Sequence, residues 1–325
     1  MRVVFMGTPA FAVPSLERLA AGGHALPLVV TRPDRPRRHG ASKPEATPVK
    51  ECARALGLDV AEPENLRGPA VLEMLASVRP EVVVVVAFGQ ILPEAVLGVP
   101  ARGAVNVHAS LLPRWRGAAP IARAILAGDT VTGVTTMQME RGLDTGPILL
   151  ERRCDIGPDE TAGELTVRLA GLGADLLIET LDGLERGTVT PLGQDESRAT
   201  WAAPLRREDG RIDWNDEAAA IAARVRACRP WPVAEAGLRD GRVQILAAAP
   251  LRPGAGASVA APARDAAAPE PGTVLETGET LVVACGGGTR LGIRSLRIPG
   301  RRAVTAREAV NGRLIASGDR LSAPA

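Results

Sequence analysis

The chain has 325 residues, 46% of them hydrophobic, and its net charge is only +2. This length suffices for two domains, and the longest apolar run, from Val82 to Phe88, is too short to cross a bilayer. The sequence contains no Tyr, three Phe and four Trp, which argues against broad stacking on single-stranded bases. These features predict a globular protein that does not associate with a membrane.

The amino terminus and the cysteines indicate a cytoplasmic protein. Met1 to Phe5 lead directly into a strand pattern, without the apolar region and cleavage site of a secretory signal. The four cysteines are far apart and match no zinc-binding or CxxC spacing: Cys52, Cys154, Cys228 and Cys285. We therefore expect reduced cysteines and no metal site.

The first part of the chain alternates predicted strands with predicted helices. Strands are expected at residues 2–7, 26–31, 81–88, 104–108, 131–137 and 148–153, and helices at 11–21, 49–58, 71–78 and 161–184. This alternation predicts an α/β fold with a parallel, doubly wound sheet. The strand at 81–88 is rich in Val and lacks polar alternation, so both of its faces should be covered.

The pattern changes after a polar stretch at residues 193–207, which we predict to be a linker between domains 1–192 and 208–325. In the second domain a helix is expected at 214–226. Short strands separated by Gly-rich turns are expected at 243–247, 281–284 and 291–296. These features predict a small antiparallel barrel, interrupted by a flexible Ala- and Pro-rich insertion at 252–272.

Three polar residues are candidates for catalysis. Asn106 and His108 lie two residues apart on a predicted strand and therefore face the same side, and Asp144 follows within a Gly-rich loop. An amide can stabilise an oxyanion, an imidazole can move a proton near neutral pH, and a carboxylate can orient that imidazole or accept a proton from an amine. From spacing alone, another interpretation is equally good. In it Asn106 and Asp144 are turn residues, and His108 is a polar residue whose hydrogen bonds are made within the fold.

Three other stretches have less specific chemistry. The turn GTPAF at 7–11 has one glycine where a dinucleotide site needs GxGxxG, which argues against NAD or FAD. The loop SLLPRWRGAAP at 110–120 either lines a pocket for a flat acidic ligand or starts a helix with surface arginines. The basic stretch from Arg32 to Lys50 either binds phosphates or is a solvated surface loop.

Taken together, several motifs resemble the methionyl-tRNA formyltransferase family, one of the families that use 10-formyltetrahydrofolate. The resemblance covers nearly the whole chain. Its motifs are GTPxFA at 7–12, PDRP at 33–36, VAFGQILP at 86–93, NVHASLLPRWRGAAPI at 106–121, GVTxM at 133–137, GLDTG at 142–146, RIDW at 211–214 and RPWP at 229–232. The central block is shared with other formyltetrahydrofolate enzymes, whereas the first two and last two motifs are more specific.

This resemblance implies a Rossmann-like formyltransferase domain with a parallel-rich sheet, followed by a smaller OB-like barrel that contacts tRNA. The implied reaction is formyl transfer from 10-formyltetrahydrofolate to the α-amino group of methionine on initiator Met-tRNA. Asn106 and His108, as an imidazolium, would stabilise the oxyanion, and Asp144 would hold His108 charged and help to move the amine proton. We expect the enzyme to be a monomer.

The resemblance also implies two sets of binding residues. Those for the folate co-substrate are Phe88, Gly89, Gln90, Ile91, Leu92, Ser110, Leu111, Leu112, Pro113, Gly142, Leu143 and Thr145. Those for tRNA are Arg35, Arg37, Arg38, Lys43, Arg206 and Arg207. In the basic loop His39 stands where the family usually has Arg, so either His39 or Arg38 takes the place of that contact.

Two other functions compete with this one. A folate enzyme could use the same three residues on a small amine or to hydrolyse formyltetrahydrofolate, but the second domain and the basic loop argue against it. An RNA-binding protein with a decayed catalytic domain is the other alternative. The intact Asn106, His108 and Asp144 argue against that alternative.

Overall fold

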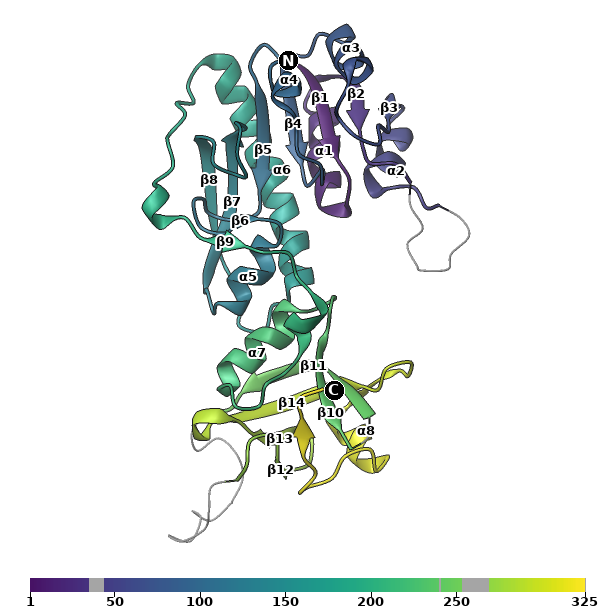
Figure 1. Cartoon of the computed structure of the whole chain (residues 1–325), viewed down its shortest axis with the longest axis vertical. Coiled ribbons are helices and arrows are strands. Elements are labelled where there is room, and N and C mark those ends of the chain that lie inside the picture. The colour runs from purple at the N-terminus through teal and green to yellow at the C-terminus, as the bar shows by residue number, and fades with distance from the viewer. Residues whose placement is uncertain (35–43, 240, 253–268, 325) are drawn as a thin grey trace. The chain divides into compact units, whose positions relative to one another are not determined.

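A computed structural model describes residues 1–34, 44–239, 241–252 and 269–324 (Figure 1). The predicted tRNA contacts Arg35, Arg37, Arg38 and Lys43 lie outside the described residues, as do His39 and most of the insertion at 252–272. The chain forms two compact units. The first comprises Met1–Pro120, Val131–Asp155 and Thr166–Ala202, and the second comprises Ile121–Thr130, Ile156–Leu165 and Ala203–Ala325.

The first unit is built on a seven-stranded sheet of order β3-β2-β1-β4-β5-β7-β8. The strands are β1 (Arg2–Gly7), β2 (Ala25–Val30), β3 (Val60–Ala61), β4 (Val82–Val86), β5 (Ala104–His108), β7 (Val131–Gln138) and β8 (Ile148–Asp155). The strands β1 to β5 run parallel, whereas β7 and β8 run antiparallel to their neighbours. The predicted parallel-rich α/β fold is therefore confirmed.

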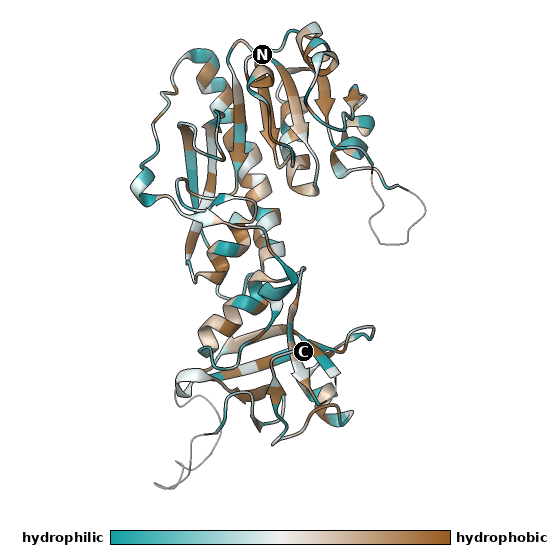
Figure 2. Cartoon of the chain, in the orientation of Figure 1, coloured by the Kyte–Doolittle hydropathy of each residue, from teal (hydrophilic) through white to brown (hydrophobic). Residues whose placement is uncertain are grey.

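Both faces of the central strand β4 are buried, as its run of Val residues predicts. Side chains of β1 and β4 alternate between two apolar clusters, one containing Val3 and Val84 and the other Val4 and Val83. Figure 2 shows these central strands as strongly hydrophobic. The first cluster includes residues of α1 (Val13–Ala21), α2 (Pro48–Ala55) and α6 (Ala162–Arg186); the second includes residues of α3 (Pro69–Ser77) and α4 (Glu94–Leu97). Helices therefore cover both faces.

A short parallel pair of strands, β6 (Arg116–Gly117) and β9 (Trp201–Ala202), ties the predicted linker to the first unit. The main-chain N–H of Arg116 donates to the carbonyl of Thr200 at 2.9 Å. Between β8 and β9 also lies a short 3₁₀ helix, η2 (Glu196–Arg198). Residues 193–202 thus lie in the first unit, and the boundaries 1–192, 193–207 and 208–325 stay a prediction.

The second unit contains an antiparallel sheet of order β12-β13-β14-β11-β10-β16, with β15 paired to β14. Its strands are β10 (Ala234–Leu238), β11 (Gly241–Pro250), β12 (Val274–Glu276), β13 (Leu281–Ala284), β14 (Arg290–Arg297), β15 (Ala303–Thr305) and β16 (Leu321–Ser322). The two edges meet through a bridge between Thr273 and Arg320. The sheet therefore curls into the small barrel-like domain that the sequence predicts.

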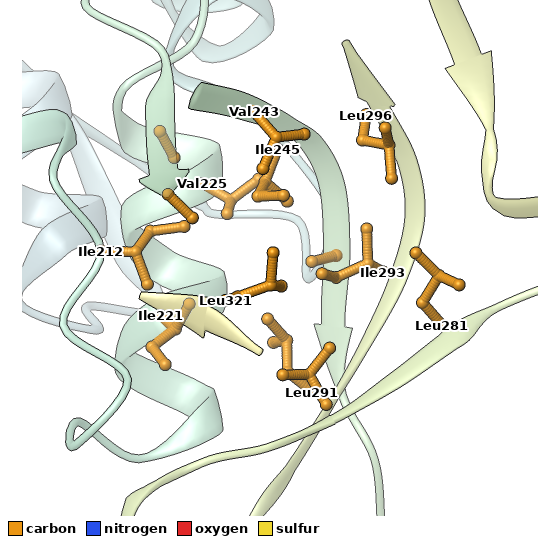
Figure 3. Packing of buried hydrophobic residues seen from close by; sticks show 14 of the residues in the cluster. Ile212, Ile221, Val225, Val243, Ile245, Leu281, Leu291, Ile293, Leu296 and Leu321 are labelled. Carbon is orange, nitrogen blue, oxygen red and sulfur yellow. The ribbon is translucent and has the colours of Figure 1, made fainter. Parts of the chain in front are cut away.

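The described residues of the second unit also form the helices α5 (Pro120–Leu126), α7 (Ala218–Ala227) and α8 (Ala306–Asn311), and the 3₁₀ helices η3 (Arg207–Gly210) and η4 (Gly286–Gly288). Figure 3 shows Ile221 and Val225 of α7 pointing toward the interior that Ile245, Ile293 and Leu321 line. These side chains are essentially unexposed, and their burial is the main source of stability of this unit. None of the described helices combines the length and apolar character needed to cross a membrane.

Candidate active site

His108 ends the central strand β5 and is almost completely buried, with 6% of its surface exposed. Its Nε2 atom lies 2.9 Å from the main-chain oxygen of Trp115. A carbonyl oxygen only accepts hydrogen bonds, so Nε2 carries a proton and donates it to Trp115. This bond fixes the orientation of the imidazole ring and leaves Nδ1 as the nitrogen that faces the rest of the site.

Asp144 lies beside His108, although the two residues come from separate elements. Its Oδ2 atom is 3.6 Å from Nδ1 of His108, and it accepts a hydrogen bond from the main-chain N–H of Gly117 at 2.8 Å. The loop between β7 and β8 leaves the sheet opposite Val105, at the amino end of β5, because these strands are antiparallel. It must therefore fold back to bring Asp144 to His108, and Asp144 has a φ of 56° there.

Asn106 lies two residues before His108 on β5, so the two side chains share one face of the strand. It is half-buried, and its amide makes no hydrogen bond with any described residue. The structure thus brings His108 and Asp144 together and leaves the Asn106 amide available on the same face. Together these residues offer hydrogen-bond donors and a carboxylate, as an acyl transfer requires.

The predicted folate residues after β4 fall into two groups. Phe88 and Leu92 are buried in the core of the first unit, where they hold the loop in place. Between them Gly89 has a φ of 80°, the Gln90 side chain donates to the carbonyl of Pro63 at 3.4 Å, and Ile91 is 89% exposed. Ile91 is therefore the large apolar side chain of this loop that is exposed to solvent.

The other predicted folate residues are divided in the same way. Ser110, Leu112 and Pro113 are buried and support the loop after His108; for example, Ser110 Oγ donates to the carbonyl of Arg114 at 2.6 Å. Leu111 is half-buried. In the loop at 142–146, Leu143 is 55% exposed, and the neighbours of Asp144 are Gly142 and Thr145. Leu143, like Ile91, is an exposed apolar side chain, and it directly precedes Asp144 in the chain.

Pro120 begins α5 and Arg114 is exposed, as one interpretation of the loop at 110–120 predicts, but Arg116 fits neither interpretation. This side chain is 1% exposed, so it is neither a surface arginine nor a ligand-binding group at the mouth of a pocket. It donates hydrogen bonds to Gln194 and forms a bidentate ion pair with Glu196. The Arg116 guanidinium holds the pKa of the Glu196 carboxyl below its usual value. Gln194 lies in the stretch at 193–207 that the sequence predicts to be a linker, so its contact with Arg116 was not expected.

A pocket opens at the carboxyl ends of β1 and β2, with a volume of about 200 Å³. Its lining residues are Thr8, Pro9, Arg32, Pro33, Glu45, Ala46, Thr47 and Pro48. The strands β1, β4 and β5 are adjacent and parallel, so this pocket lies on the same edge of the sheet as His108. Ligands of open α/β sheets bind at this edge.

Lys50 does not belong to a phosphate-binding surface, contrary to one interpretation of the basic stretch. It is 5% exposed, and its Nζ atom lies 2.6 Å from Asp34 Oδ2 and 2.7 Å from Glu62 Oε2. The hydrogen bond from Lys50 lowers the pKa of Asp34, and the bonds to Asp34 and Glu62 raise the pKa of Lys50. A hydroxyl contact of 2.8 Å between Thr31 and Thr47 lies beside this cluster.

We expect Lys50→Met to lower Tm by roughly 3–8 °C at neutral pH, because Asp34 and Glu62 lose their buried partner. The lowered pKa of Asp34 means that its contribution to stability is present above about pH 4 and is lost as the pH falls through its folded-state pKa. The difference in Tm between variant and parent should therefore shrink below about pH 4. Thermal unfolding between pH 3 and pH 8 measures this, with the exposed Arg54→Met on the same helix as the control. A Tm difference that is unchanged by acid would contradict the ion-pair interpretation.

The remaining predictions concern tRNA and metal. Arg206 and Arg207 are exposed at the start of η3 in the second unit. In the described part of the chain, no group of three or more His, Cys, Asp or Glu residues is placed to hold a metal ion.

Comparison with known proteins identifies the family. A model of formyl transferases matches residues 1–181, and a model of the formyl transferase C-terminal domain matches residues 204–314. Methionyl-tRNA formyltransferases of Solibacter usitatus and Methylococcus capsulatus are 47% and 48% identical to this chain. Each match covers 99% of this chain and, respectively, 98% and 99% of the relative.

Among solved structures, the N-formyltransferase of Helicobacter canadensis, in complex with folinic acid and dTDP-3-aminofucose, has a similar fold. The TM-score is 0.65 at 17% identity, over 90% of this chain and 98% of the other. The two methionyl-tRNA formyltransferases named above share much more sequence with this chain than this structure does, over nearly the whole length of the chain. The chain belongs to the methionyl-tRNA formyltransferase family.

Proposed function

We propose that this protein transfers the formyl group of 10-formyltetrahydrofolate to the α-amino group of methionine on initiator Met-tRNA. The observation that carries the proposal is the buried pair of His108 and Asp144, 3.6 Å apart, within a chain of this family. The pair supplies a proton donor and a carboxylate in a site shielded from water, where charge interactions are strong.

Two exposed apolar residues of the first unit suit a flat co-substrate with an apolar face. Ile91 and Leu143 are large, mostly exposed side chains on two separate loops, and covering them with a ligand removes apolar surface from water. When bound there, 10-formyltetrahydrofolate supplies the formyl group. Phe88 and Leu92 would act indirectly in this arrangement, by fixing the loop that carries Ile91.

His108 and Asn106 would stabilise the negative charge that develops on the formyl oxygen as the amine attacks. Because Nε2 is bound to Trp115, the Nδ1–H of a protonated His108 is the donor that faces the reacting groups. Its distance of 3.6 Å from Asp144 is longer than a hydrogen bond, so this proton is available to the oxyanion. The Asn106 amide, on the same face of β5, is the second donor.

Asp144 would take the proton that the attacking amine releases, directly or through one water molecule, and a proton returns to the folate nitrogen as its bond to the formyl carbon breaks. Its Oδ2 atom is held by the N–H of Gly117, whereas its Oδ1 atom accepts no hydrogen bond from the described residues. The carboxylate thus has one anchored oxygen and one that can receive a proton.

The tRNA would be bound chiefly through phosphates. Arg206 and Arg207 are exposed cations of the second unit and are suited to such contacts. We retain Arg35, Arg37, Arg38 and Lys43 as further contacts in this proposal. Binding through these six residues should weaken as the salt concentration rises, because the association releases counterions from the tRNA.

The proposal is tested by following labelled formyl from 10-formyltetrahydrofolate to Met-tRNA, with initiator and elongator tRNAs in parallel. We expect rapid formylation of the initiator and little of the elongator. Equal formylation of both would refute initiator selectivity. Hydrolysis of the folate, or transfer to a small amine with none to Met-tRNA, would show that the substrate has been assigned wrongly.

A further inference from the structure

A buried arginine fixes the orientation of the Gln194 side chain. The Nε and Nη2 atoms of Arg116 donate to Gln194 Oε1 at 3.0 and 2.8 Å. A guanidinium can only donate, so the carboxamide must present its oxygen to Arg116 and its NH₂ group to the opposite side. Glu196 binds the same guanidinium at 2.8 and 2.7 Å and thereby keeps Arg116 in place.

The NH₂ group of Gln194 in turn holds the loop that carries Asp144. Its Nε2 atom donates to the main-chain oxygens of Asp144 at 2.9 Å and of Gly146 at 2.7 Å. Both N–H bonds of the amide are therefore used, one on each side of Thr145. This is the part of the loop that must fold back along β5, and the left-handed φ of Asp144 requires support from its surroundings.

We propose that Gln194, oriented by Arg116, is a positioning residue for formyl transfer: it sets the distance between the Asp144 carboxylate and His108. The N–H of Gly117, next to Arg116, binds the Asp144 carboxylate itself. The strand β6 thus fixes Asp144 twice, directly at the carboxylate and through Gln194 at the main chain. This inference rests on the proposed function, since it assigns a role within that reaction.

Removal of the Gln194 side chain should impair turnover more than binding. We expect Gln194→Ala in the full-length protein to lower kcat by about 10- to 100-fold, because a displacement of about 1 Å in a catalytic group can cost on the order of 100-fold. The KM values for 10-formyltetrahydrofolate and Met-tRNA should stay within about threefold of those of the parent. The exposed neighbour Asp195→Ala, whose carboxylate binds Ser197, is the matched control and should keep the parental kcat.

A second variant separates positioning from folding. Gln194→Glu still accepts hydrogen bonds from Arg116, so the buried guanidinium keeps its partner and the protein should fold. Its second oxygen, however, replaces the NH₂ group and faces two carbonyls, so the loop loses both donors. We expect kcat of Gln194→Glu to fall at least as far as that of Gln194→Ala. A Gln194→Glu variant with parental kcat would overturn the inference.

A double-mutant cycle with Asp144→Asn gives the decisive comparison. If Gln194 acts through Asp144, adding Gln194→Ala to Asp144→Asn should reduce the single-turnover rate by less than about threefold. Independent, multiplicative losses would overturn the inference. An inactive parent protein would instead refute the proposed function, whereas an active parent with an equally active Gln194→Ala variant would refute only the role of Gln194.

Discussion

Replacement of His108 by alanine should lower the rate of formyl transfer by about 10²- to 10⁴-fold, while binding of the folate co-substrate persists. The variant loses the only imidazole that faces Asp144 among the described residues, and with it a proton donor to the oxyanion. The folate is expected to bind through loops that carry Ile91 and Leu143, which the substitution does not alter. Single-turnover transfer to Met-tRNA and calorimetric titration with a non-reactive folate analogue measure the two effects.

Two further variants make this result interpretable. His24→Ala removes a histidine that lies outside the site and should leave the transfer rate unchanged within about twofold. His108→Gln keeps an amide N–H that can reach the position of Nε2 and donate to the Trp115 carbonyl, so it should fold even if His108→Ala does not. If His108→Gln folds, binds the folate analogue and transfers formyl at the parental rate, His108 has no catalytic role.

Asp144→Asn should lower kcat by a similar factor, about 10²- to 10⁴-fold, with almost no change in stability. The asparagine oxygen can still accept the hydrogen bond from Gly117, so the loop should keep its conformation. The negative charge beside the imidazole is lost, however, and so is the acceptor for the amine proton. Steady-state kinetics and thermal unfolding of the same preparation separate the two quantities.

The control for this substitution is Glu140→Gln, which removes an exposed carboxylate from the same loop. It should leave kcat within about twofold of the parental value. If Asp144→Asn keeps full activity, proton transfer must occur elsewhere and Asp144 is only a structural residue. If Glu140→Gln is as slow as Asp144→Asn, the effect arises from the net charge of the loop and not from contact with His108.

Much of the fold could be predicted because its central strands consist mainly of apolar residues. The runs at 2–7 and 81–88 have no polar alternation, and they form β1, which is buried apart from Arg2, and the fully buried β4. The strands β3, β6 and β9 were missed because each has two residues and is stabilised by its pairing partners. A strand that short leaves no periodic pattern in the sequence.

The candidate site could be predicted only in part, since spacing along a strand is local information. Asn106 and His108 share a face because of the period of a β-strand. The approach of Asp144 depends on a loop that folds back across antiparallel strands, which no local pattern encodes. The contact between Arg116 and Gln194 joins residues 78 positions apart, and a polar stretch containing Gln194 has the composition of an ordinary linker.

The side chains of His108 and Asp144 are anchored by main-chain atoms, the oxygen of Trp115 and the N–H of Gly117. Every amino acid supplies a main-chain carbonyl group. A different side chain at position 115 therefore leaves in place the acceptor that selects which nitrogen of His108 carries the proton. Gly117 is more constrained: its φ is 120°, and a Cβ atom there would lie 2.8 Å from the oxygen of Ala202. Position 115 can therefore be varied, with residues that tolerate its φ of 61°, while the carbonyl that accepts from His108 is left in place.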